Sequence, residues 1–447
     1  MFTDDWDTLT PDQRLAARLD AWQNAPIEFA SPEVAAAYRD RVQLYRDAIG
    51  LKKPARVPIA PWIGLFPLRY AGFTAHDAYY DTGKLAEAWD RYHRDFMPDG
   101  LAVSTVIIPG RLFDLLDYKL YQWPGHGTPE DTSYQYVERE WMKDDEYDAL
   151  INDPSSYWQH RYLPRAFGAL EPLAMLAPFT DLVEMPFTFP FFLPFTAPPV
   201  REMLGKIVEA SDLAMDWLQT LIAIDGKQIA TLGIPGLAGG ATKAPYDVLG
   251  DTMRGTRGLM LDKFRRLDKV LEACDRLVPN LVDWAVRACD VNRHPLCFIP
   301  LHKGADGFMS DEDFRTIYWP SFKKVLLGLI DQGIVPLCFA EGGYNERLEA
   351  IRDPEIPAGR MIWMFDSTDM RAAKRNLGGY QCFGGNVPGS LLTMGTPEKV
   401  EAYVKDLIGA VAGDGGFILG TGIVLDEADP ACFKAFVEAG RRYGAQV

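Results

Sequence analysis

The sequence predicts an α/β fold of the (β/α)8 barrel type, with an N-terminal helical extension and a large insertion in the first half. Short apolar runs alternate with helix-length segments from residue 296 onward, which favours parallel strands joined by helices. Neither a G-x-G-x-x-G motif nor a P-loop follows any run, so a barrel fits better than a nucleotide-binding open sheet. The strand candidates of this half are 296–301, 334–340, 361–365, 380–383 and 416–419.

The first half repeats the pattern less regularly. Residues 1–50 read as helices, with Thr10 and Ser31 as N-caps. Strand candidates follow at 57–62, 102–108 and 229–234. We therefore expect an extension over 1–50 and a barrel over 51–447, with residues 111–225 as a loop and helical insertion over the barrel mouth.

Composition narrows the classes of partner. The formal net charge of −16 disfavours nucleic acid and anionic membranes as partners.

The cysteines and the N-terminus bear on where the protein is located. Six cysteines without a Cys-x-x-Cys pair indicate reduced thiols and a cytoplasmic protein. The N-terminus lacks the basic and apolar regions of a signal peptide. The longest apolar stretch, 187–195, is short and interrupted by prolines, so no membrane span is expected.

Polar residues follow several of the predicted strands and should converge at the carboxyl ends of a parallel sheet. His302, Glu341 and Cys382 form a candidate three-ligand zinc set, because a catalytic zinc needs three N, S or O ligands and an open position. Each has a plainer interpretation: His302 as a structural hydrogen bonder, Glu341 as a paired carboxylate, and Cys382 as a small apolar core residue.

Other residues at the same strand ends are candidates for acid–base chemistry or substrate binding. Asp366 stands directly at a strand end, and with Glu341 it is a candidate catalytic acid or base. Asp369 and Asn386 are candidate substrate contacts, although Asp369 is also placed to cap a helix. Trp62 belongs to an aromatic set that could cover an apolar cleft or pack in the core. The other members are Phe66, Phe187, Phe189, Phe191 and Phe192. The basic motif at 254–258, with Arg254 and Arg257, could hold an anionic group of a substrate or cofactor, but we favour ion pairs with Asp251 and Asp262.

Several motifs in the C-terminal third resemble the uroporphyrinogen decarboxylase superfamily. The most specific is a G-T-P-E-x-V box that follows a strand and a G-N-V-P sequence. The resemblance implies a (β/α)8 barrel with a cleft at the carboxyl ends of its strands. The residues that carry it are Gly307-Phe308-Met309-Ser310, Tyr318-Trp319-Pro320, Gly385-Asn386-Val387-Pro388, Gly395-Thr396-Pro397-Glu398-Lys399-Val400 and Gly415-Gly416-Phe417-Ile418.

Departures from the family pattern decide which branch the chain is similar to. Decarboxylases carry an arginine-rich R-Q-A-G-R segment after the first strand, where this chain has only Arg69, and an L-G-H-G motif, where it has Thr421 in place of His. The coenzyme M methyltransferases of the corrinoid branch bind zinc through H-x-C and a later Cys. Here Glu341 stands at the first Cys position and the later Cys is missing.

The resemblance implies a corrinoid-dependent methyltransferase that moves a methyl group between a small donor, such as a methoxylated aromatic, and a cobalamin carried by a partner protein. Zinc is the expected metal and O-demethylation the expected reaction type. The alternative function is a decarboxylase or lyase that uses Asp366 and Glu341 as acid and base. The third hypothesis is a non-catalytic protein that binds a corrinoid or tetrapyrrole. The sequence leaves open whether the protein forms a homodimer.

Overall fold

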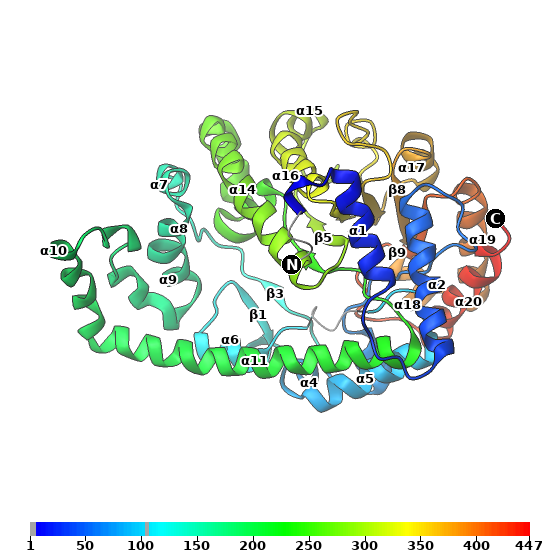
Figure 1. Cartoon of the computed structure of the whole chain (residues 1–447), viewed down its shortest axis with the longest axis horizontal. Helices are drawn as coiled ribbons and strands as arrows, with labels where there is room; N and C mark the ends of the chain where they lie inside the picture. The colour runs from blue at the N-terminus through cyan, green and yellow to red at the C-terminus, as the bar shows by residue number, and fades with distance from the viewer. Residues whose placement is uncertain (1–5, 103–106) are drawn as a thin grey trace.

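The centre of the computed structural model, which describes residues 6–102 and 107–447, is a sheet of six parallel strands (Figure 1). Each strand is hydrogen-bonded to the next one along the chain. Parallel neighbours with helical crossovers confirm the predicted α/β class. The strands are β4 (Gly240–Ala241), β5 (Leu296–Leu301), β6 (Val335–Ala340), β7 (Ile362–Phe365), β8 (Cys382–Val387) and β9 (Phe417–Thr421).

Two further segments extend this sheet in the order a barrel requires. The Ala60 N–H donates to the Leu419 carbonyl of β9 at 2.8 Å, and the Asp99 N–H donates to the Ile59 carbonyl at 2.9 Å. The segments around residues 59 and 99 thus lie at the first and second strand positions. The assigned strand ladders cover the other six positions and do not by themselves close the ring.

Helices cover the outside of the sheet and bury their apolar faces against it. The outward-facing side chains of the strands, such as Ile299, Cys338 and Trp363, share one core cluster with these helices. The covering helices are α5 (Thr82–Phe96), α12 (Pro245–Val248), α13 (Gly255–Arg265), α14 (Leu267–Val291), α16 (Trp319–Asp331), α17 (Met370–Leu377), α18 (Gly389–Met394), α19 (Pro397–Val411) and α20 (Pro430–Gly444).

The N-terminal extension consists of α1 (Pro11–Gln23) and α2 (Pro32–Ile49), and the predicted caps Thr10 and Ser31 are confirmed. Trp22 and other apolar residues of these helices share a cluster with inward-facing residues near the start of the strands. Arg14 of α1 donates to the Asp331 carbonyl at the end of α16, at 2.9 Å. The extension therefore covers the end of the barrel where the strands begin.

The insertion forms an arm on one side of the barrel. Figure 1 shows α7 to α10 well to the left of the strands, with α11 running from this arm to the barrel. None of the helices in the described ranges is both long and apolar enough to cross a membrane. The elements of this region are α6 (Gly110–Leu116), β1 (Tyr121–Pro124), β2 (Gly127–Thr128), β3 (Gln135–Tyr136), α7 (Tyr147–Asn152), α8 (Pro154–Tyr157), α9 (Leu163–Ala166), α10 (Met185–Thr188) and α11 (Pro198–Leu232).

Two predicted strands are corrected. The strand expected at 229–234 is wrong, because α11 continues to Leu232 and the third strand position is held by β4. The strand expected at 380–383 begins at Cys382 and continues through the two glycines to Val387. Of the predicted strand at 102–108, residues 103–106 lie outside the described residues.

Candidate functional site

A layer of polar side chains lies at the carboxyl ends of β5 to β8. Strand side chains alternate between the two faces of a sheet, and the register pairs Pro300 with Phe339, Phe339 with Met364 and Met364 with Gly384. Two residues further along each strand, the same inward-facing positions are polar. They are His302, Glu341, Asp366 and Asn386.

His302 and Glu341, both predicted from the sequence, come together here. His302 Nε2 lies 3.5 Å from Glu341 Oε1, and its Nδ1 lies 2.5 Å from Asp251 Oδ2. The imidazole is thus held between two carboxylates. Only about a third of the His302 side chain is exposed, while Glu341 is the more open of the pair. This geometry fixes the ring and leaves its Nε2 edge toward the mouth.

Asp251 binds three cationic side chains at once. It accepts from Lys243 Nζ at 2.7 Å and lies 3.1 Å from Lys303 Nζ, in addition to its contact with His302. The neighbouring Asp247 is fully buried and accepts from the backbone N–H groups of His302 and Lys303, at 3.2 and 2.8 Å. Asp247 therefore positions the loop that carries His302.

Sequence reasoning missed the roles of Asp247 and Asp251. The predicted pairing of Arg254 with Asp262 is confirmed, with Nε 2.5 Å from Oδ2. Asp251, the other predicted partner, instead pairs with Lys243, His302 and Lys303. A usable signal was the spacing: aspartates four residues apart on one helical stretch share a face. That stretch follows β4, so its face meets the end of β5.

These contacts set the charge of His302. Burial alone lowers its pKa, but the hydrogen bonds to Asp251 and Glu341 outweigh burial and raise the pKa of His302 to about 10. For Asp251, burial is likewise outweighed, and His302 and Lys243 hold the pKa of its carboxyl well below its usual range. Burial raises the pKa of Asp247. His302 is accordingly an imidazolium at neutral pH.

Cys382 does not lie beside His302 and Glu341, the other two members of the predicted zinc set. Cys382 is the first residue of β8, and it pairs with Ile362, which in turn pairs with Leu337. It is fully buried in an apolar cluster with both. Glu341 is four residues beyond Leu337 along its strand, a distance of about 13 Å. The thiol therefore lies in the barrel interior, below the polar layer.

The predicted zinc set thus does not fit this geometry. Only two of its three members, His302 and Glu341, meet at the polar layer. Within residues 6–102 and 107–447, no group of three or more His, Cys, Asp or Glu side chains is arranged to hold a metal ion.

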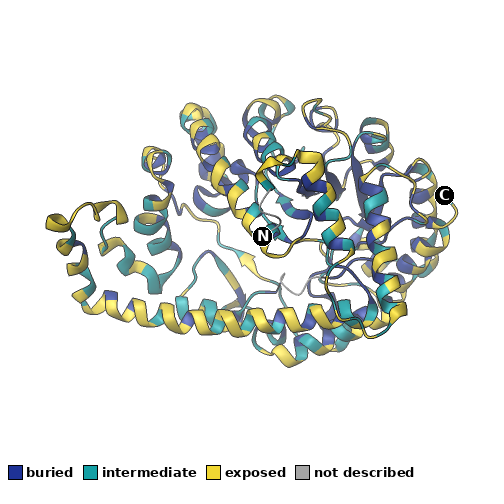
Figure 2. Cartoon of the chain, viewed as in Figure 1, coloured by how far each residue is buried: buried dark blue, intermediate teal, exposed yellow. Residues whose placement is uncertain are grey.

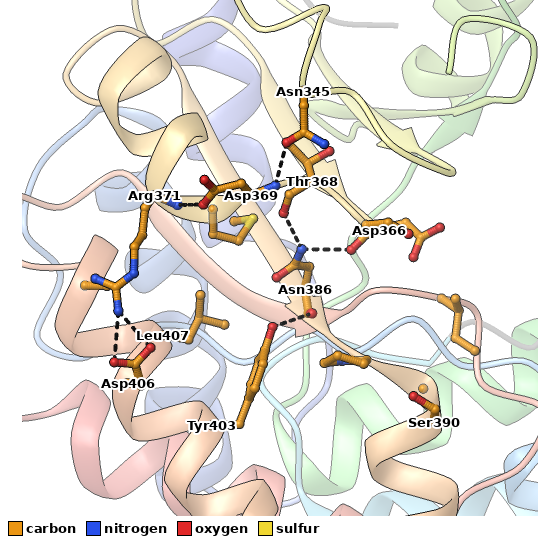
Figure 3. Close-up of a pocket in the computed structure, with 16 residues that line it drawn as sticks. Asn345, Asp366, Thr368, Asp369, Arg371, Asn386, Ser390, Tyr403, Asp406 and Leu407 are labelled. Atoms are coloured by element: carbon orange, nitrogen blue, oxygen red, sulfur yellow. Dashed lines mark hydrogen bonds and ion pairs between the residues drawn. The ribbon is translucent and has the colours of Figure 1, made fainter. Parts of the chain in front are cut away.

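Asp366 and Asn386 lie beside one another at the ends of β7 and β8 (Figure 3). Asp366 Oδ2 accepts from the Gly342 N–H at 2.9 Å, next to Glu341. Asn386 Nδ2 donates to the carbonyls of Asp366 and Thr368, both at 2.8 Å. Asn386 Oδ1 is buried and accepts no hydrogen bond from the described residues. It is available to accept one from a ligand.

A cavity of about 640 Å³ adjoins these residues, between the loop after β7 and helix α19. Asp366, Asp369 and Asn386 are among its lining residues. Asp369 also caps α17, since its Oδ1 accepts from the Arg371 N–H at 2.8 Å. Figure 3 shows Arg371 turned away from Asn386 and toward Asp406. The predicted capping role of Asp369 is confirmed, and its contact with a substrate stays a prediction.

Trp62 lies among inward-facing aromatic residues, one strand layer from the polar groups. Its ring centroid is 5.1 Å from that of Phe298 and 5.0 Å from that of Phe339. Its backbone N–H donates to Thr421 Oγ1 at 2.9 Å, which gives Thr421 a structural role. Trp62 Nε1 is buried without a partner among the described residues. Trp62, Phe298 and Phe339 form an apolar wall beneath the mouth, whereas Phe187, Phe189 and Phe192 of the predicted set are exposed in the insertion.

Two tyrosines of the insertion reach the same region and were not singled out from the sequence. Partial burial raises the pKa of Tyr134, which is 47% exposed, and the nearby Tyr121 and Glu341 raise it further. Burial and the charge of Asp251 likewise raise the pKa of Tyr121. The two rings pack edge to face, with centroids 5.5 Å apart. The stretch from β1 to β3 therefore brings phenol groups to the electrostatic neighbourhood of the His302 site.

The fold resembles that of solved structures. A methyltransferase from Methanosarcina mazei superposes with a TM-score of 0.58 over 90% of this chain and 98% of its own, at 13% identity. A B12-independent methionine synthase from Shewanella sp. W3-18-1 gives a TM-score of 0.31 at 10% identity, over 46% of this chain and 60% of its own. That second likeness is too partial to bear on the fold.

Sequence comparison places the chain in a family. No curated protein sequence matches it. The family model described as uroporphyrinogen decarboxylase (URO-D) matches residues 196–443, which is more than half of the chain and includes β4 to β9 with the polar layer at their ends. This chain therefore belongs to the uroporphyrinogen decarboxylase family.

Proposed function

We propose that the chain is a methyltransferase that moves a methyl group from a small methyl ether, such as a methoxylated aromatic compound, to a corrinoid carried by a partner protein. The observation that carries the proposal is the His302 imidazole, held between Asp251 and Glu341 at a mouth walled by aromatic rings. The likeness in fold to a methyltransferase supports it.

The difficulty in cleaving a methyl ether is the leaving group. When the methyl–oxygen bond breaks, its electron pair stays on oxygen, and an alkoxide or phenoxide leaves poorly unless it gains a proton. His302 Nε2 would donate that proton, while the contact between Asp251 and Nδ1 fixes the orientation of the ring. Glu341 holds the Nε2 edge until the ether oxygen takes its place. The corrinoid, when bound, supplies the nucleophile that accepts the methyl group.

The apolar wall suits the rest of such a donor. Trp62, Phe298 and Phe339 offer ring faces that could stack on an aromatic ring and exclude water from the reacting oxygen. Tyr121 and Tyr134 would contact the donor from the side of the insertion. Asn386 Oδ1, which has no donor among the described residues, could accept a hydrogen bond from a polar substituent.

A carboxy-lyase remains the second candidate, and the cations near Asp251 favour it. His302, Lys243 and Lys303 together could hold a carboxylate. However, they already face the carboxylates of Asp251 and Glu341, and Asp247 lies beside them, so little positive charge is left for a substrate. One small carboxylate would fit this balance better than a tetrapyrrole that bears many.

The test is methyl transfer to free cob(I)alamin, followed by its absorbance change, with a panel of methoxylated aromatic donors. We expect turnover by the wild type and a loss of about 10²- to 10⁴-fold in His302→Gln. His160→Gln in the insertion, where His160 hydrogen-bonds Ser156 and the Leu176 carbonyl, serves as the matched control.

Three outcomes would overturn the proposal. Release of CO₂ from a carboxylated substrate, without methyl transfer from any donor, would favour the lyase. Corrinoid binding without turnover, unchanged in Glu341→Gln, would favour a binding protein. Full activity of His302→Gln would remove the proposed acid. Metal analysis of the purified protein tests the sequence-based prediction of zinc separately.

A further inference from the structure

Helix α11 carries an exposed apolar stripe along most of its length. The stripe consists of Leu204, Val208, Met215, Leu218 and Ile222, which are 38% to 64% exposed. With Ser211 included, successive positions are four and three residues apart in strict alternation, the spacing of a coiled-coil seam. An α-helix turns by about 100° per residue, so the stripe occupies one narrow face.

This stripe is not the face that packs on the rest of the chain. The buried residues of α11 include Met203, Ala210, Leu221 and Ile224, which lie about 120° around the helix from the stripe. Helix α11 contacts α2, α5 and α6. Figure 2 colours much of α11 as exposed along its whole length. The helix therefore has two apolar faces, of which the protein itself covers one.

A phenylalanine cluster continues this surface at the start of α11. Phe179, Phe187, Phe189 and Phe192 are 58% to 70% exposed. Phe191 is buried at the centre of the cluster, with ring centroids 5.6 Å from Phe179 and 5.2 Å from Phe192. The segment that holds them, η6 (Phe189–Thr196), packs on the first turns of α11. The stripe and the cluster thus lie on neighbouring elements.

The apolar area is larger than an ordinary monomer surface carries. Four largely exposed phenylalanines and their aliphatic neighbours Met175, Val183, Met185 and Leu193 expose on the order of 1,000 Å². The largest apolar patch on a typical monomer is about 300–600 Å². Two such surfaces facing each other would bury about 2,000 Å² or more, which is the size of an obligate homodimer interface.

Charge and composition narrow the occupant to a second copy of the chain. Residues 166–200 contain Glu171, Asp181 and Glu184 and neither Lys nor Arg, so this surface repels nucleic acid and anionic lipid. A transient partner such as a carrier protein meets a surface only about as apolar as the rest of the protein. A predominantly apolar face with a seam that can pair with itself is typical of a permanent isologous contact.

We propose that the apolar stripe of α11 and the phenylalanine cluster form the interface of a homodimer, in which the two α11 helices pack against each other along their stripes. The arm formed by the insertion then serves to join two barrels. This inference does not depend on the proposed reaction.

The experiment measures the mass of the full chain in solution by light scattering and by sedimentation over a range of concentrations. We expect a particle of about 100 kDa, twice 50.1 kDa, that persists at about 1 µM. Leu218→Asp/Ile222→Asp places two charges in each seam and should weaken the dimer by about 100-fold or more. Gln219→Asp/Ala223→Asp adds the same charges about 100° around the helix and should remain dimeric.

A second variant tests the contact without disrupting it. Ser211→Cys, near the middle of the stripe, should form a disulfide-linked dimer on mild oxidation, whereas the native cysteines are buried. Circular dichroism of both double variants shows whether α11 still folds. A wild-type monomer at about 100 µM would overturn the proposal. So would a dimer that survives the stripe substitutions, or a monomer that binds neutral lipid vesicles through the cluster.

Discussion

Replacing Asp251 by Asn should make His302 a weaker base without moving it. The carboxylate that binds Nδ1 at 2.5 Å is removed, while Asn keeps the shape and one hydrogen-bonding oxygen. Lys243 and Lys303 then lose their common partner, and their charges disfavour a proton on His302. We therefore expect the pKa of His302 to fall.

The size of the effect follows from the pKa of His302, which rises from 6.5 to about 10 because Asp251 and Glu341 outweigh burial. That difference corresponds to about 5 kcal/mol. A carboxylate in contact contributes about 1–3 pK units, so Asp251→Asn should lower the pKa by that amount, or by about 1.4–4 kcal/mol. Because the folded pKa lies above 6.5, this stabilisation is complete below pH 6.5 and is lost as pH rises through about 10.

The assay is an NMR titration of protein with labelled histidine, with the His302 signal assigned from His302→Gln. The chain has six histidines, so the signals can be separated. Asp290→Asn, which breaks an ion pair with Arg18, is the control and should leave the His302 titration unchanged. A wild-type pKa of His302 near 6.5, or no change in Asp251→Asn, would refute this account of the site.

Three further outcomes are expected. Trp62→Ala removes a ring that packs against Phe298 and Phe339 in the apolar wall. KM for an aromatic donor should therefore rise about tenfold, with a smaller change in kcat. An unchanged KM would place the donor elsewhere. Cys382→Ala should retain activity and metal content and lose about 1 kcal/mol of stability to urea, whereas lost activity would return the thiol to the site. Burial lowers the pKa of His93 to about 4, so its protonation should cost up to about 3 kcal/mol of stability to urea as pH drops from 6.5 toward 4. Since burial lowers the pKa of His294 to about 4 as well, His93→Gln should remove only part of this pH dependence.

The strand ends could be predicted from sequence because each strand is a short apolar run that stops at a polar or glycine residue. The meeting of His302 and Glu341 follows from that pattern and from parallel pairing. What the sequence could not supply was register within each strand. Gly384 looks like a turn residue, yet it lies inside β8, where a Cβ would come within 2.5 Å of the Met364 sulfur. This glycine is required by packing in the barrel interior.

The same limit explains the error at Cys382. With the glycines taken as a turn, the thiol seemed to end its strand, whereas it begins it and Asn386 nearly ends it. Local preference also failed at 229–234, where β-branched residues favour a strand but α11 continues, because its buried face packs on neighbouring helices. The role of Asp251 was missed because its partner His302 is 51 residues away in sequence and is brought to it only by the fold.

The first helix and the first strand segment make contacts with residues that are synthesised much later. Arg14 finds its acceptor at Asp331, 317 residues later, and the Trp62 N–H finds Thr421 359 residues later. At about 5–20 residues per second, the ribosome needs roughly 20–70 s to reach Thr421 after it has made Trp62. Until then the apolar faces of α1 and α2 have nothing to cover. The nascent chain should therefore depend on chaperones at its beginning rather than at its end.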